Sequence, residues 1–175
     1  GISFHSNMKD SVDDFHYGPR QTKSGYHGAM DQGQISEHGF NHMLDCVAAM
    51  KEVLGDKVSL ALDCGPGWFL NDAIRFARAV EKYDLMWLED MITGDYVPYV
   101  NPDLYREVTP PTTTPIHTGE QIYNRQNFKD LIETHAVDVV GPDPCDVGGI
   151  AELKWIAELA DLHGIAIAPH GTANG

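Results

Sequence analysis

Three segments decide the fold of this chain: Val58-Ser-Leu-Ala-Leu-Asp63, Leu85-Met-Trp-Leu-Glu89 and Pro115-Ile-His-Thr-Gly-Glu120. Each places a carboxylate at the end of a short apolar run, as expected for a parallel strand covered on both faces. The carboxylates are 26 and 31 residues apart, and one strand plus one helix of a (β/α)8 barrel takes roughly 30 residues. The spacing therefore predicts that the three acids lie side by side at one rim of a barrel.

Three carboxylates at one rim repel one another. The usual way to stabilise such a group is a hard divalent cation such as Mg²⁺. A single acid at a strand end is more often a helix cap or a solvated group, but the repetition at three strand ends favours a ligand set. We therefore interpret Asp63, Glu89 and Glu120 as a metal site.

Apolar periodicity predicts strands and helices in alternation along the rest of the chain. Ser36 is a typical N-cap for a helix that ends at Gly55. This alternation favours parallel strands joined by helical crossovers, the α/β class. The other expected elements are helices over residues 71–83, 103–108, 125–134 and 150–162, and strands over residues 1–7, 137–140 and 165–168.

Length and loop composition set the expected domain organisation. The 175 residues are fewer than the roughly 250 of a closed barrel. We therefore expect residues 1–175 to form one partial C-terminal barrel domain, without the capping domain and the last strand. Residues 8–35 have loop composition, and a loop of this length is commonly a lid or binding loop. We expect it on the active-site side, with His16 and His27 as possible ligands or solvated side chains.

Composition excludes several classes of partner. Twelve Lys and Arg against 26 Asp and Glu give a net charge of −14, which repels nucleic acid and anionic membranes. The three widely spaced cysteines form no disulfide or CxxC pattern. No apolar run approaches the roughly 20 residues of a membrane span. We expect a cytoplasmic protein with no nucleic-acid or membrane partner, and a homo-oligomer, although the sequence does not set the number of subunits.

Two further polar residues follow strands in the same way as the acids. Asp143 comes just after the expected strand 137–140, and His170 just after 165–168. Adjacent strands of a barrel bring such residues together at the C-terminal rim. A carboxylate bonded to one imidazole nitrogen fixes the tautomer and raises the basicity of the other nitrogen. The sequence thus predicts His170 as a general acid or base, with Asp143 as its partner.

As an ordered set, these residues resemble the enolase superfamily in its mandelate racemase/muconate lactonizing enzyme-like branch, which includes acid-sugar dehydratases. The matching text is Leu-Asp63, Trp-Leu-Glu89-Asp90, Gly-Glu120, Asp143 followed by Val147-Gly-Gly-Ile150, and Ala-Pro-His170-Gly. The resemblance covers residues 35–175. It implies a (β/α)8-type (TIM-like) barrel, Mg²⁺ held by the three acids, and a catalytic dyad of His170 and Asp143.

The resemblance also implies a reaction. The enzyme would abstract the proton α to the carboxylate of a small-molecule substrate, giving an enediolate that Mg²⁺ stabilises. Loss of a β-hydroxyl then gives a 2-keto-3-deoxy acid, whereas return of the proton on the other face gives an epimer. Family members often carry Lys-x-Lys after the second strand, but Phe4-His-Ser-Asn-Met-Lys9 has no such pair. This favours dehydration of an acid sugar, a lyase reaction, over racemisation, which needs two bases.

Two alternatives from other classes stay open. Gly65 and Met91 stand where the family often has Asn and Pro, which is compatible with a catalytically silent metal-binding homologue. A doubly wound receiver or nucleotide-binding domain would also alternate strands and helices, but the sequence has no phosphate-binding loop.

The candidate substrate-binding residues are Lys9, His117 and Arg125.

Overall fold

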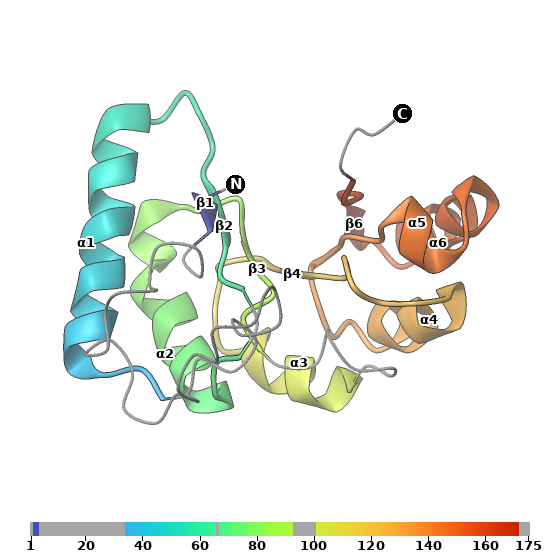
Figure 1. Ribbon diagram of the computed structural model, residues 1–175, viewed down its shortest axis with the longest axis horizontal. Coiled ribbons are helices and arrows are strands. Elements are labelled where there is room, and N and C mark those ends of the chain that lie inside the picture. The colour runs from blue at the N-terminus through green and yellow to red at the C-terminus, as the bar shows by residue number, and fades with distance from the viewer. Residues whose placement is uncertain (1, 4–33, 66, 93–100, 172–175) are drawn as a thin grey trace, which may run out of the picture.

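The computed structural model describes residues 2–3, 34–65, 67–92 and 101–171 (Figure 1). Six strands form one parallel sheet in the order β1-β2-β3-β4-β5-β6, so that neighbours in sequence are neighbours in the sheet. This singly wound order is that of a (β/α)8 barrel wall and differs from the doubly wound alternative, in which the strand order reverses. The strands are β1 (Ile2–Ser3), β2 (Ala61–Asp63), β3 (Trp87–Glu89), β4 (Ile116–Thr118), β5 (Val139–Val140) and β6 (Ala166–Ile167).

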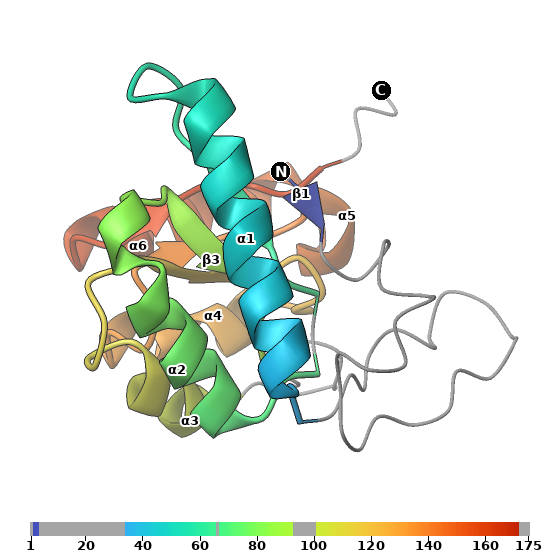
Figure 2. The ribbon, with the colours of Figure 1, turned by 90° about the vertical axis from the view of Figure 1, so that its left-hand side faces the viewer.

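Helices connect successive strands and surround the sheet on its outside (Figures 1 and 2). The helices are α1 (Glu37–Leu54), α2 (Leu70–Ala79), the 3-10 turn η3 (Glu81–Tyr83), α3 (Pro102–Val108), α4 (Arg125–Glu133), α5 (Pro144–Val147) and α6 (Ile150–Leu162). The predicted α/β barrel architecture is therefore confirmed. The expected helix over 71–83 is divided into α2 and η3, and α5 was not predicted. The long loop expected over residues 8–35, with His16 and His27, lies almost entirely outside the described residues, as does Lys9.

The first described helix forms where the sequence predicts it. The Ser36 side chain accepts a hydrogen bond from the Gly39 N–H at 3.0 Å, a cap that typically contributes about 1 kcal/mol. At the other end of the helix, the Gly55 N–H donates a hydrogen bond to the Lys51 carbonyl. Phe40 is buried on the inner face, and its ring meets that of Phe76 in α2 edge to face. The helix is thus fixed by its caps and by one apolar stripe.

The pleat of each strand separates the core from the site. In β2 and β3 the central Leu62 and Leu88 are fully buried, and the flanking residues are partly exposed. Side chains alternate across a sheet, so Asp63 and Glu89 project to the face opposite the two leucines. The helices cover the leucine face, where Phe76 and Phe128 are also fully buried. The acids are therefore left on the inner side of the wall.

Helix length and hydropathy bear on membrane insertion. No helix within the described ranges combines the length and the apolar character needed to cross a membrane.

Candidate active site

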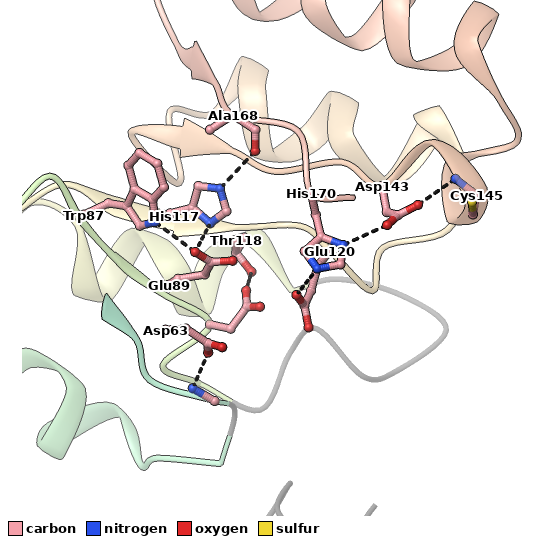
Figure 3. A network of polar contacts seen from close by, with 12 residues as sticks. Asp63, Trp87, Glu89, His117, Thr118, Glu120, Asp143, Cys145, Ala168 and His170 are labelled. Carbon is pink, nitrogen blue, oxygen red and sulfur yellow. Dashed lines mark hydrogen bonds and ion pairs between the residues drawn. The ribbon is translucent and has the colours of Figure 1, made fainter. Parts of the chain in front are cut away.

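Strand register brings the first two acids together. Asp63 and Glu89 are Cα partners across β2 and β3, and Glu89 and His117 are partners across β3 and β4. Glu120 follows Gly119, the residue directly after β4, which has a φ of +142°. A Cβ added at Gly119 would lie only 2.9 Å from the Phe128 ring. A larger residue before Glu120 would therefore collide with the core. The ends of three adjacent strands thus meet at one edge of the sheet (Figure 3).

A compact group of acids lies at this edge. Glu89, Asp90 and Glu120 each offer a carboxylate oxygen, and these oxygens lie within 4.8 Å of one another. Asp63 is not a member of this group, and its Oδ1 accepts a hydrogen bond from the Gly65 N–H at 2.9 Å. All members are carboxylates, and oxygen donors of this kind fit a hard cation such as Mg²⁺. The structure thus adds Asp90 to the residues that surround the predicted metal position.

The predicted pair of His170 and Asp143 forms in the structure. His170 Nδ1 lies 2.7 Å from Asp143 Oδ2, and His170 Nε2 lies 3.1 Å from Glu120 Oε2. The other Asp143 oxygen accepts the Cys145 N–H at 2.6 Å, which makes Asp143 the N-cap of the short helix α5. One nitrogen of the ring is therefore held by the fixed acid, and the other faces the acid group (Figure 3).

The charges around the pair shift both pKa values. Burial lowers the pKa of His170, but the hydrogen bond to Asp143 and the negative charges of Glu120, Asp143 and Glu89 outweigh burial and raise it. Burial raises the pKa of Asp143, but the hydrogen bonds from His170 and from the Cys145 N–H offset burial and hold this pKa below its usual value. At neutral pH Asp143 is therefore an anion, and it stabilises the positive charge of the imidazole whenever the ring gains a proton.

The raised pKa of His170 predicts a pH dependence of stability. A histidine has an unperturbed pKa of about 6.5. Because folding raises the pKa, the stabilisation from His170 is fully present below about pH 6.5 and is lost as the pH rises through the folded value. In the metal-free protein, the difference in unfolding free energy between the wild type and His170→Asn should therefore shrink with rising pH. Urea unfolding at several pH values measures this difference, and growth of the difference with pH would contradict the assignment.

Asp90 is buried, and hydroxyl groups from β4 and α3 form a hydrogen-bonded chain that ends at its carboxylate. Asp90 is 1% exposed, and its Oδ1 accepts a hydrogen bond from Thr118 Oγ1 at 2.8 Å. Thr118 Oγ1 lies 2.9 Å from the Tyr105 hydroxyl. A buried carboxylate is costly without such partners. The network therefore fixes the acid that follows Glu89 in the chain.

The network predicts the effect of a near-isosteric change, Thr118→Val. Valine cannot donate to Asp90, and a buried acceptor that loses a hydrogen bond costs about 1–3 kcal/mol. The free energy of unfolding should fall by about that amount, measured by urea denaturation. Thr113→Val is the control, because Thr113 is exposed and lies outside this network. Its side-chain and backbone hydrogen bonds to Glu81 are at the surface, where water can replace the lost partner. Equal stability of Thr118→Val and the control would contradict the role of the network.

The candidate substrate-binding residues have separate surroundings. His117 is 2% exposed, and its ring stacks on Trp87 beside Glu89. Arg125 begins α4, where its Nε lies 3.2 Å from a Glu152 oxygen. The structure thus brings His117 to the acids and places Arg125 in an ion pair with α6.

Comparisons with known proteins agree with this architecture. A family model described as enolase C-terminal domain-like matches residues 16–175. D-xylonate dehydratase of Haloferax volcanii is 39% identical over 134 residues, which cover 77% of this chain and 31% of that protein. The chain spans 30–37% of the length of the curated relatives it matches.

Solved structures give the same result. A mandelate racemase/muconate lactonizing enzyme-like protein from Rubrobacter xylanophilus is 41% identical with a TM-score of 0.73, over 79% of this chain and 34% of that one. L-talarate dehydratase from a Polaromonas species, solved with Mg and L-glucarate, is 29% identical with a TM-score of 0.71, over 79% of this chain and 38% of that one. With most of its residues matched by the family model, the chain belongs to the enolase C-terminal domain-like family.

Proposed function

We propose that this protein is an Mg²⁺-dependent lyase that dehydrates an acid sugar to a 2-keto-3-deoxy acid. The observation that carries the proposal is the position of His170, held by Asp143 on one side and facing Glu120 on the other. The relatives support the substrate class, since they include a D-xylonate dehydratase and an L-talarate dehydratase solved with Mg and L-glucarate.

Glu89 and Glu120 would hold the cation together with Asp63, with Asp90 fixed beside them. Bound Mg²⁺ would supply the positive charge that offsets the negative charge developing on the substrate carboxylate. Because Asp63 Oδ1 accepts the Gly65 N–H, Asp63 would offer the cation its other oxygen, Oδ2. The close approach of the other acids is what supports a hard cation here, because their mutual repulsion needs compensation.

His170 would act twice. Nδ1 donates to Asp143, so the neutral ring presents the lone pair of Nε2 to the substrate. Nε2 would take the proton α to the carboxylate, and the C–H electron pair would enter the enediolate. The same nitrogen would then return the proton to the departing β-hydroxyl, which leaves as water. Tautomerisation of the resulting enol gives the 2-keto-3-deoxy acid, so one dyad is sufficient for a syn elimination.

Racemisation or epimerisation is the alternative on the same scaffold, and it needs a second base on the opposite face of the substrate. Lys9, a candidate substrate-binding residue, is also a candidate for that base, and it lies outside the described residues. Substrate binding by His117 and Arg125 stays a prediction. The same holds for a homo-oligomeric state, a cytoplasmic location, the absence of nucleic-acid and membrane partners, and the assignment of residues 1–175 to one partial barrel domain.

The complete gene product, incubated with Mg²⁺ in D₂O and a library of aldonic, uronic and aldaric acids, tests the proposed reaction by proton NMR. A new, partly deuterated C3 methylene beside a keto group would establish dehydration and identify the sugar. Deuterium at C2 with the hydroxyl retained would overturn dehydration in favour of epimerisation. Mg²⁺ binding without exchange at C2 for any acid would instead indicate a silent metal-binding homologue.

A further inference from the structure

An aromatic side chain holds one oxygen of Glu89. Trp87 is two residues before Glu89 on β3, so both side chains project from the same face of the sheet. The Trp87 indole N–H donates to Glu89 Oε2 at 2.9 Å (Figure 3). The indole N–H is neutral and can only donate a hydrogen bond, so it can fix the carboxylate without competing for a cation.

His117 holds the indole in turn. Its ring stacks on Trp87 with centroids 5.0 Å apart and an interplanar angle of 18°. His117 Nδ1 is 3.7 Å from Glu89 Oε2, and Nε2 is 3.4 Å from the Ala168 carbonyl oxygen. These contacts connect β3, β4 and the segment after β6. The imidazole therefore lies between the Trp87 indole and the Ala168 carbonyl.

The space for the His117 ring exists because residue 141 is glycine. A Cβ at Gly141 would lie 2.3 Å from His117 Cε1 and 2.5 Å from Nε2. No residue with a side chain fits there while the ring keeps its place, because real Cβ atoms do not approach this closely. Gly141 does not have a positive φ, so an alanine there would act on the ring and not through backbone strain.

We propose that Trp87 and His117 are positioning residues that fix the Glu89 carboxylate for cation binding, with Gly141 leaving the room that their stacking needs. The proposal rests on the proposed function in one respect, that Glu89 is a metal ligand. The last torsion of a glutamate is broad and roughly two-fold. The indole hydrogen bond restricts this torsion before the cation arrives, so less conformational freedom is lost on binding.

Trp87→Phe isolates the hydrogen bond, since phenylalanine keeps an aromatic ring against His117 and lacks the N–H donor. Mg²⁺ affinity, measured by isothermal titration of the complete metal-free protein, should weaken about 10–100-fold, as is typical when a partner of a metal ligand is removed. Trp155→Phe is the matched control, because Trp155 lies on α6 against Arg125 and not beside Glu89. This variant should bind Mg²⁺ with the affinity of the wild type. A role confined to folding would lower the melting temperature and leave the affinity of the folded protein unchanged.

A spectroscopic signature separates this proposal from the metal site itself. In protein labelled with 5-fluorotryptophan, the ¹⁹F resonance absent from Trp87→Phe belongs to Trp87. Mg²⁺ should shift this resonance in the wild type and leave it in place in Glu89→Gln. If Glu89→Gln binds Mg²⁺ as the wild type does, the metal assignment fails. If Glu89→Gln loses affinity but Trp87→Phe keeps it and the resonance does not move, the positioning role alone is overturned.

A double-mutant cycle tests the part played by His117. Gly141→Ala and His117→Ala should each weaken Mg²⁺ binding. If the alanine Cβ acts only by displacing the imidazole, the double variant should bind no more weakly than His117→Ala alone. Losses that add in full would overturn the proposed route from Gly141 through His117 to Glu89.

Discussion

His170→Asn should lose turnover by about 10³-fold or more while binding Mg²⁺ nearly as well as the wild type. Positioned acid–base groups typically contribute roughly 10²–10⁴-fold, and His170 is proposed to serve in both proton transfers, so the loss should lie toward the upper end. The ring contacts Asp143 and Glu120 and is not proposed to bind the cation. Turnover by NMR and affinity by isothermal titration measure the two quantities separately.

The control for this variant is His135→Asn. His135 is exposed and has a positive φ of 52°, a conformation that asparagine adopts readily. It should therefore keep both activity and affinity. Normal turnover in His170→Asn would contradict the proposed mechanism, and a large loss of Mg²⁺ affinity would show that the ring takes part in cation binding.

Elements with a long apolar stripe could be predicted closely from the sequence. Helix α6 was expected over residues 150–162 and is Ile150–Leu162, because its core-facing side repeats at the helical period. The strands were less well placed, since β2 was expected over 58–62 and is Ala61–Asp63. An apolar run does not mark where pairing begins: Val58 is 52% exposed, and the register with β3 starts at Ala61.

Two features of the site had different sequence signals. Helix α5 has a sequence signal, because Asp143 is a typical N-cap residue and Pro144 is favoured at the first position of a helix. The burial of Asp90 had no such signal. It depends on Thr118, 28 residues further along the chain, and on Tyr105 from α3, and neither contact is visible in local periodicity. Strand-end position therefore located the acids, while their individual environments required the tertiary structure.

Glu120→Ala should reduce Mg²⁺ affinity by more than the roughly 10–100-fold that removal of a supporting partner costs, because it deletes a member of the acid group itself. Glu120 lies within 4.8 Å of both Glu89 and Asp90, ligand oxygen to ligand oxygen. The variant also removes one of the negative charges that raise the pKa of His170, so this pKa should fall. Isothermal titration and the NMR titration of His170 measure the two effects.

Two further variants separate these effects. Asp143→Asn should lower the His170 pKa through loss of the charged acceptor and leave Mg²⁺ affinity nearly intact, because Asp143 is not in the acid group. Glu133→Ala removes a surface carboxylate paired with Lys129 and should change neither quantity. Because an exposed carboxylate is screened by water, only the acids at the strand ends should control the cation. If Glu120→Ala retains the wild-type affinity, the ligand assignment is wrong, whatever the pKa of His170 does.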